Sequence, residues 1–337
     1  MASVSMKDVA SVAGVSTATV SHVLNGTRNV NDETREKVEL AIKLLNYRVN
    51  SVGRTLRSGS SKIIGYVASN LSINFYMYIG RAITHVLSEA GYNIIYADSQ
   101  EDPRIEKRNI QNMIQQNVDG LIIVPVNQDC SYLEQMIGDL CPCVFLARNP
   151  IGYESDAVLA SNFEAVYESI NLLIEKGHKN IGYMAAISNT TAIERLNGYK
   201  AALSDHNLPI LDNIIKFGSG ELESYKAQKL GNSYKLTGEL MKNKDITALF
   251  ISDGLSTVGA VNYLFTHHYH IPRDLAVITF DDAFWLSMTN PSFTVTEQDT
   301  EGLGRKSAEV LLNRIHNSEN PYQVYRIPNK LIIRESC

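Results

Sequence analysis

The stretch Met6-Lys-Asp-Val-Ala-Ser-Val-Ala-Gly-Val-Ser-Thr-Ala-Thr-Val-Ser-His-Val-Leu-Asn25 decides how the chain begins to fold. Val9, Ala10 and Ala13 lie on one face of a short helix. Gly14 follows at the point where a helix C-terminus needs a left-handed residue. Two short helices joined by a glycine turn form a helix-turn-helix unit. The stretch therefore predicts such a unit at the start of the chain.

Ser16 is placed to cap the second helix, because a serine side chain can accept from the free backbone N–H groups of the first turn. That helix would bury Val20, Val23 and Leu24 and end near Asn25. A third helix is indicated by a capping residue and a periodic apolar face, namely Asn31 or Asp32, then Val38, Ile42 and Leu45. Three short helices make a small all-α head.

The second helix carries residue types that suit DNA. The first residues of a recognition helix face base edges in the major groove, and here these are Thr17 and Ala18, with His22 one turn further on. Short polar side chains around them suit phosphate oxygens, which fix the register on DNA without reading the sequence. They are Ser16, Thr19, Ser21, Asn25 and Thr34. The alternative is that this set is only a solvated helix face.

Composition and charge limit the class of protein. The chain has 337 residues and a net charge of −5, which suggests two or three domains. Its first 62 residues are basic and the rest is acidic, as expected for a head that meets a polyanion. The 4 cysteines are too sparse for a disulfide framework. No apolar run is long enough for a membrane span and the N-terminus lacks a secretory pattern, so we expect a cytoplasmic protein with reduced thiols and no membrane partner.

The head resembles that of the lac repressor (LacI/GalR) family of bacterial transcription regulators. The resemblance rests on Lys7-Asp-Val-Ala, Ala13-Gly-Val-Ser and Ala18-Thr-Val-Ser-His-Val-Leu-Asn-Gly26, and continues through the rest of the chain. It implies an all-α helix-turn-helix head followed by an α/β, periplasmic-binding-protein-like core of two lobes with parallel sheets. The implied head is 1–49, followed by a hinge helix and linker over 50–61 and an effector-binding and dimerisation domain over 62–337.

The resemblance also implies a hinge helix that enters the minor groove in pairs. Asn50 would contact DNA there and Leu56 would wedge between base pairs, where apolar insertion kinks the duplex. Val49 stands where the family usually has proline, and Gly53 where it usually has alanine. Glycine costs about 1 kcal/mol in a helix relative to alanine, so we expect this hinge to become ordered only on DNA.

After Lys62 short apolar runs alternate with helix-length segments, which predicts parallel sheets covered by helices. The predicted strands are 63–67, 93–96, 120–124, 144–146, 180–184, 248–251 and 275–280. The resemblance places chain crossings between the lobes near 160, 291 and 323. The first lobe is then 62–160 with 291–322, and the second is 161–290 with 323–337.

The resemblance assigns effector-binding residues to both lobes. Arg195 matches the family's ligand-clamping arginine and Asp281 matches the acidic residue that accepts from ligand hydroxyls. A guanidinium and a carboxylate facing each other across an apolar cleft can hold a small polar molecule, although the pair could instead be an interlobe salt bridge. The other candidates are Ile73, Phe75, Tyr76, Ile79, Arg148, Thr191, Ser252 and Gln298.

Departures from the family pattern bear on the effector. Ala147 and Ala160 stand where relatives usually carry aspartate, and Leu222 where an aromatic ring often stacks on the ligand; Trp285 could replace that surface. With these acids lost, Arg148 and Arg195 would make the cleft cationic. This favours an effector with a negative group, such as a sugar phosphate, over a generic hexose.

Enzyme signatures such as G-x-S-x-G, the P-loop and H-E-x-x-H are missing from the sequence, so we expect no catalytic residues and no cofactor. The run 267–270 contains three histidines, yet its place before a turn favours a solvated loop over a metal site.

One head reads only a few base pairs, so specificity needs a homodimer, possibly within a tetramer, on a near-palindromic operator. Effector closure of the lobes would change the hinge spacing and hence the affinity for DNA. Two alternatives stay open. The regulator could respond to a phosphorylated protein partner, or the chain could be an enzyme or solute-binding protein with a vestigial head.

Overall fold

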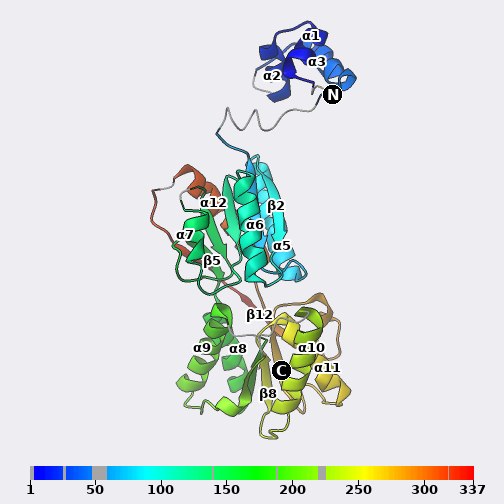
Figure 1. The fold of residues 1–337 in the computed structure, drawn as a ribbon. Coiled ribbons are helices and arrows are strands. Elements are labelled where there is room, and N and C mark those ends of the chain that lie inside the picture. The colour runs from blue at the N-terminus through cyan, green and yellow to red at the C-terminus, as the bar shows by residue number, and fades with distance from the viewer. Residues whose placement is uncertain are drawn as a thin grey trace. The chain divides into compact units, whose positions relative to one another are not determined.

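The computed structural model describes residues 4–25, 28–47, 59–138, 140–186, 189–218, 225–317 and 319–337. It divides the chain into two compact units, Met1–Ser61 and Lys62–Cys337, which we call the head and the body. Figure 1 draws the head in dark blue and the body from cyan to red. The predictions for Asn50, Gly53 and Leu56 lie outside the described residues.

The head contains three helices, α1 (Met6–Ala13), α2 (Thr17–Asn25) and α3 (Asp32–Leu44). Ser5 and Asp8 form a capping box at the start of α1, and Gly14 ends that helix with a φ of 65°. The Ser16 hydroxyl accepts from the backbone N–H of Thr19 at 3.1 Å, as expected for the cap of α2. Asn31 rather than Asp32 caps α3.

A small apolar core holds these three helices together. Val9, Val20 and Val38, one from each helix, are fully buried, and Val23, Leu24, Ile42 and Leu45 pack against them. Burying one face of each helix is what stabilises helices this short, since isolated short helices are marginal in water. The helix-turn-helix fold predicted from the sequence is therefore present.

The first lobe of the body is built on a six-stranded sheet in the order β11-β5-β4-β3-β1-β2, and every strand pair in it is parallel. Side chains of α5 and α12 pack on one face of this sheet and those of α6 and α7 on the other. The elements are β1 (Ile63–Ala68), α5 (Asn74–Glu89), β2 (Asn93–Asp98), α6 (Pro103–Gln115), β3 (Gly120–Ile123), α7 (Tyr132–Met136), β4 (Cys143–Leu146), β5 (Asp156–Ala160), α12 (Thr300–His316) and β11 (Val324–Ile327).

The second lobe has a six-stranded sheet in the order β12-β10-β9-β8-β6-β7, in which only the β10–β12 pair is antiparallel. Helices α8 and α9 cover one face and α10 and α11 the other. The elements are α8 (Asn162–Glu175), β6 (Ile181–Ala185), α9 (Thr190–Asp205), β7 (Ile215–Phe217), α10 (Tyr225–Leu240), β8 (Ala248–Ile251), α11 (Gly254–Thr266), β9 (Ala276–Phe280), β10 (Thr294–Glu297) and β12 (Lys330–Ile332), with 3₁₀ turns at Asp212–Ile214 and Phe284–Ser287. The α/β architecture with two lobes and largely parallel sheets is as expected from the sequence.

Two of the predicted chain crossings are wrong by several residues. Strand β10 pairs with β9 in the second lobe, so the chain returns to the first lobe after 297 rather than near 291. Strand β11 pairs with β5 in the first lobe, so the last crossing follows 327 rather than 323. The reason is that each lobe completes its sheet with a strand from the far C-terminal part of the chain.

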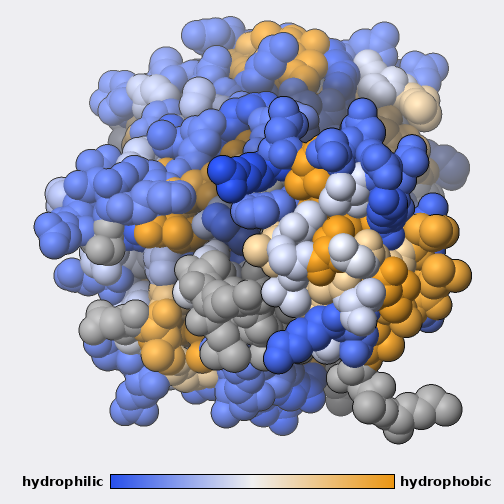
Figure 2. Space-filling view, turned by 90° about the horizontal axis from the view of Figure 1, so that it is seen from above, coloured by the Kyte–Doolittle hydropathy of each residue, from blue (hydrophilic) through white to orange (hydrophobic). Residues whose placement is uncertain are grey.

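Close helix packing in the first lobe depends on glycine. A β-carbon added to Gly304 of α12 would lie 2.5 Å from the carbonyl oxygen of Ile79 in α5, so the two helices touch through their backbones. None of the helices in the described ranges is long and apolar enough to cross a membrane. On the face drawn in Figure 2, hydrophilic residues cover most of the surface and hydrophobic residues gather in a few patches.

Candidate DNA-binding and effector sites

The start of α2 presents the side chains that the sequence predicts to read bases. Ser16, Thr17 and Ala18 are exposed, whereas Val20 on the opposite side of the helix is buried in the head core. His22, one turn further on, is half-buried. The fold therefore directs the N-terminal end of α2 to solvent, where it can enter a groove of DNA.

The residues predicted to contact phosphates are less uniformly placed. Thr19, Ser21 and Thr34 are half-buried, and Ser16 and Thr19 share a hydrogen bond between their hydroxyls at 2.9 Å. The side chain of Asn25 lies outside what the structure describes. Ser16 thus has a capping role that is independent of any contact with DNA.

In the body, the predicted effector residues gather at the carboxyl ends of strands in both lobes, the usual ligand side of parallel sheets. Tyr76 lies in α5 after β1, and Arg148 lies just after β4. In the second lobe Arg195 lies in α9 after β6, Ser252 directly follows β8 and Asp281 directly follows β9. The chain order of strand and loop therefore explains why residues so far apart in sequence converge.

Arg195 has a buried side chain that hydrogen bonds hold in place. It is 7% exposed, its Nε donates to Oδ1 of Asn162 at 2.9 Å, and its Nη1 donates to the carbonyl of Ser252 at 2.6 Å. The guanidinium carbon lies 3.5 Å from the ring centre of Phe280. Burial lowers its pKa, and the charge of Asp281 opposes this most strongly. A guanidinium has five N–H donors, and these two hydrogen bonds use two of them.

Asp281 supplies the matching acceptor. Its backbone has a φ of 74°, an uncommon conformation outside glycine, and its Oδ1 accepts from Nε2 of Gln298 at 2.6 Å. Burial raises the pKa of Asp281, while Arg195 and Gln298 lower it. Asp281 and Arg195 lie on the same lobe, so the alternative of an interlobe salt bridge between them is wrong, whereas their joint contact with a ligand stays a prediction.

The prediction that Arg148 makes the site cationic is also wrong. Both of its terminal nitrogens donate to the carboxylate of Glu101, at 3.1 and 2.8 Å, and the side chains are 11% and 10% exposed. Nη1 also donates to the carbonyl of Pro125 at 2.9 Å. Glu101, which follows β2, is thus the acid beside Arg148.

The apolar candidates around α5 divide into two groups. Tyr76 is 7% exposed, its ring contacts Phe75 edge to face at 5.1 Å, and its hydroxyl accepts from Arg148 at 3.4 Å. Ile73 and Phe75 are half-buried. Ile79 is fully buried within the first-lobe core, so its predicted contact with a ligand is wrong: it lies on the face of α5 that packs against α12.

Contacts between the lobes bring the two halves of this site together. Thr191 of α9 donates from its hydroxyl to the carbonyl of Ala147 at 3.2 Å. Tyr76 of the first lobe lies close enough to Arg195 of the second for an electrostatic interaction between them. Polar groups from both lobes therefore surround one region, which we call the interlobe site.

Sequence reasoning missed three residues of the interlobe site, namely Glu101, Asn162 and Asp253. Asn162 is 1% exposed and holds Arg195, and Asp253 caps α11 and adds negative charge near Asp281. Each follows the carboxyl end of a parallel strand, a position that could have marked all three. Within the described residues, no group of three or more His, Cys, Asp or Glu side chains is placed to hold a metal.

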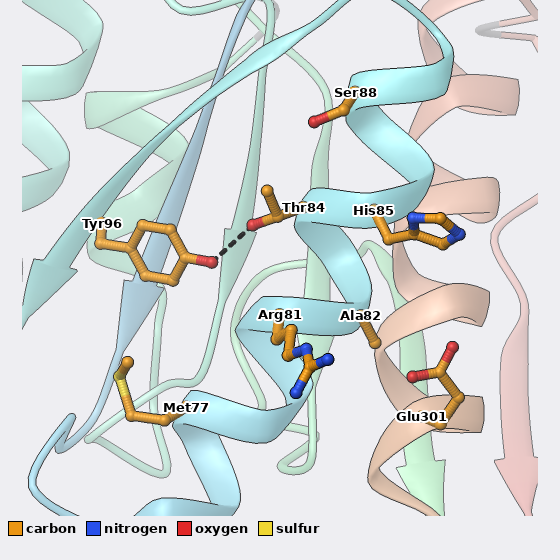
Figure 3. A pocket seen from close by; sticks show the side chains of 8 residues that line it. All are labelled: Met77, Arg81, Ala82, Thr84, His85, Ser88, Tyr96 and Glu301. Carbon is orange, nitrogen blue, oxygen red and sulfur yellow. Dashed lines mark hydrogen bonds between the residues drawn. The ribbon is translucent and has the colours of Figure 1, made fainter.

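A separate pocket lies on the outer side of the first lobe, with a volume of about 670 Å³. Figure 3 shows Arg81 and His85 from α5 beside Glu301 from α12. The hydroxyls of Thr84 and Tyr96 share a hydrogen bond at 2.6 Å on its inner wall. Its rim thus carries both positive and negative groups.

Comparisons with known proteins agree with this geometry. Residues 5–50 match the family described as bacterial regulatory proteins, lacI family, and residues 170–337 match the periplasmic binding protein-like domain. The HTH-type transcriptional repressor PurR of Mannheimia succiniciproducens is 31% identical over 98% of both chains. Among solved structures, the lac repressor dimer bound to operator and the anti-inducer ONPF is 25% identical over 99% of both chains, with a TM-score of 0.84. The transcriptional regulator CelR in complex with cellobiose is 26% identical over 99% of this chain and 100% of that one, with a TM-score of 0.72.

Proposed function

Because the chain belongs to the lacI family of bacterial regulatory proteins, we propose that it is a repressor whose affinity for its operator is set by a small molecule held at the interlobe site. It is a DNA-binding transcriptional regulator rather than an enzyme. The observation that carries the DNA-binding part is the exposed start of α2 on a three-helix head. Since its target would be the chromosome, we place its action in the cytoplasm.

Recognition of the operator would use Thr17, Ala18 and His22 for base edges and Asn50 and Leu56 of the hinge for the minor groove. A threonine hydroxyl can hydrogen-bond to a base, and an alanine methyl packs against thymine. Specific binding should weaken steeply as salt rises, because phosphate contacts release counterions. A mobility-shift titration on fragments selected from random DNA tests this, and a chain that selects no sequence would contradict the proposal.

The effector would be a polyhydroxylated molecule without a phosphate group. Arg195 offers hydrogen-bond donors and Asp281 offers acceptors, and a sugar hydroxyl can satisfy both because it donates and accepts. Arg148 is already neutralised by Glu101, and Asp253 adds negative charge near Asp281, so a phosphate would meet carboxylates here. The proposal of a neutral sugar rests on the chemistry of these side chains. It replaces the sugar phosphate that the sequence favoured. The cellobiose in the CelR complex is a ligand of this class.

A thermal-shift screen tests the effector class, since a ligand that binds only the folded chain raises its melting temperature. The panel pairs cellobiose, ribose and glucose with glucose 6-phosphate and ribose 5-phosphate, and adds free nucleobases. We expect a neutral sugar to raise the melting temperature and to change operator affinity. If only the phosphate esters bind, the proposal of a neutral sugar effector is wrong. If no compound changes operator binding, control by a phosphorylated protein partner is favoured.

A homodimer would place two heads on one near-palindromic operator, and we assign the contact between the two first lobes to the outer face of α5. Met77 and Tyr78 are 46% and 56% exposed there, and Arg81 and His85 lie beside Glu301. A twofold interface uses the same patch on both copies and must therefore be self-complementary. Met77 and Tyr78 form an exposed apolar strip on α5, and side chains of both charge signs lie at its edge. Such a patch can pair with a second copy of itself.

A further inference from the structure

The first two turns of α9 carry two contacts that join the lobes. Thr191 donates to the carbonyl of Ala147 at 3.2 Å. One turn further on, Glu194 accepts from Nη2 of Arg326 at 2.7 Å, and Arg326 lies on β11, in the sheet of the other lobe. The ion pair between Glu194 and Arg326 is partly exposed, at 30% and 42% of the respective side chains.

Behind this ion pair, hydrogen bonds lead inward to the interlobe site. The second carboxylate oxygen of Glu194 accepts from Nδ2 of Asn162 at 3.2 Å. The carbonyl oxygen of the same Asn162 side chain accepts from Nε of Arg195 at 2.9 Å. Because one amide group contacts both residues, its orientation is fixed from two sides. An unbroken series of hydrogen bonds thus runs from Arg195 to the first lobe.

The helices that carry these hydrogen-bonded residues are tightly packed. A β-carbon on Gly198 of α9 would lie 2.3 Å from the carbonyl oxygen of Phe163 in α8, so the two helices are in direct backbone contact. Asn162 opens α8 and is 1% exposed. A displacement of Glu194 toward or away from the first lobe would therefore be transmitted to Asn162 rather than absorbed by loose packing.

We propose that Asn162, Glu194 and Arg326 are positioning residues that couple the spacing of the two lobes to the orientation of the Arg195 guanidinium. When the Glu194–Arg326 pair forms, the lobes are held together and Arg195 is locked. When the pair breaks, the lobes separate and Arg195 loses its fixed direction. The inference deepens the proposed function, since it treats Arg195 as an effector contact.

Lobe spacing can be measured on the full chain without effector or DNA. A dye pair is attached at Gln111→Cys on α6 and Lys235→Cys on α10, both exposed positions, in a Cys337→Ser background. We expect Arg326→Gln to lengthen and broaden the distance distribution relative to the parent chain. About 1 M salt, which shortens the screening length to about 3 Å, should move the parent in the same direction.

The matched control is Arg273→Gln, which removes a guanidinium from an exposed ion pair with Asp274 inside one lobe and should leave the distance unchanged. Arg326→Lys keeps the charge and should recover most of the parent distance. An Arg326→Gln chain that melts like the parent and shows the parent distance would overturn the inference.

A second measurement follows Arg195 itself, through solvent exchange of its Nε proton by NMR, assigned with Arg195→Lys. Arg326→Gln and Glu194→Gln should each raise the exchange rate by about two- to fivefold, the range expected from loss of an exposed ion pair, whereas Arg273→Gln should not. Unchanged exchange in both variants would show that Arg195 is fixed independently of lobe spacing. Neither measurement uses DNA or a ligand, so the inference and the proposed function can fail separately.

Discussion

The charge of Arg148 is compensated by Glu101, which lies 47 positions away in the sequence. Its guanidinium forms a two-point ion pair with Glu101, and both side chains are almost completely shielded from water. Removing one member of a buried pair leaves the other charge without compensation. The sign of the charge at this site therefore depends on the pair and not on Arg148 alone.

We expect Arg148→Gln to lower the free energy of unfolding by about 3 kcal/mol, the cost of stranding a buried carboxylate. Arg273→Gln, which breaks an exposed pair, should cost less than about 1 kcal/mol. Urea unfolding of both variants followed by circular dichroism measures the difference. An equal loss of unfolding free energy in the two variants would mean that water reaches Glu101 freely.

Glu106 is a second buried carboxylate whose protonation affects stability. It is fully buried and accepts from the backbone N–H of Val126 at 2.7 Å and from the hydroxyl of Tyr132. Burial raises its pKa above the ordinary value of 4.5, and the hydrogen bonds only partly oppose this. The folded chain therefore binds this proton more tightly than the unfolded chain, so the stabilisation is full at low pH and is lost as pH rises through the folded pKa.

Glu106→Gln has no proton to lose, so its stability relative to the parent chain should improve as pH rises above 4.5 and through the raised pKa of Glu106 in the folded chain. The substitution can also change stability equally at every pH, because an amide replaces one accepting oxygen by an N–H donor. The prediction concerns how the difference in unfolding free energy between variant and parent chain changes with pH. Urea unfolding at a series of pH values measures it, with the exposed Glu168→Gln as control, and a difference that stays constant with pH refutes the assignment.

Candidate site residues could be predicted from the sequence near each of them. The distant residues that form hydrogen bonds with them could not. Arg195 and Asp281 could be assigned because the residues around them match the pattern of the lacI family. Glu101 and Asn162 each follow a strand, but their partners could not be predicted, since the contacts Glu101–Arg148 and Asn162–Arg195 span 47 and 33 residues. Ile79 was misplaced because an apolar residue on a helix next to a site can face either the ligand or the core, and only packing against α12 decides.

At the scale of elements, helices α5 and α12 depend on contact through Gly304. We expect Gly304→Ala to destabilise the body by about 1–3 kcal/mol, because the added methyl group would force two packed backbones apart. Gly231 in α10 has no atom within 4 Å of an added β-carbon, so Gly231→Ala should be neutral or stabilising by up to about 1 kcal/mol. The melting temperature should therefore fall for Gly304→Ala and stay the same or rise for Gly231→Ala; an equal fall in both variants would contradict the close contact.

The head and most of the strands were predictable because local rules decide them: a left-handed glycine, a serine cap and apolar runs of strand length. Strands β10 and β11 were not among the predicted strands. Thr294-Val-Thr-Glu and Val324-Tyr-Arg-Ile are short and polar at alternate positions, so they lack the continuous apolar run typical of a central parallel strand. Their sheet membership is set by pairing with distant strands, which explains why the crossings were placed too early.

At the scale of the whole molecule, function requires two heads, and the contact between copies should therefore control DNA binding. Met77→Glu puts a carboxylate in the apolar strip of α5, where burial against a second copy would be unfavourable. We expect the dimer dissociation constant, measured by sedimentation, to rise at least about tenfold, which corresponds to about 1.4 kcal/mol. Operator affinity should fall with it at concentrations where the variant is monomeric, because a single head contacts one half-site.

The same substitution at an unrelated exposed apolar residue separates this effect from a general effect of added charge. Ile151, 70% exposed in the loop between β4 and β5, provides that control as Ile151→Glu. This variant should remain dimeric and bind operator like the parent chain. Raising the concentration of Met77→Glu should restore operator binding, since mass action refills the dimer. If Met77→Glu stays dimeric at nanomolar concentration, the copies meet through another surface and the self-complementary charges around α5 have a different role.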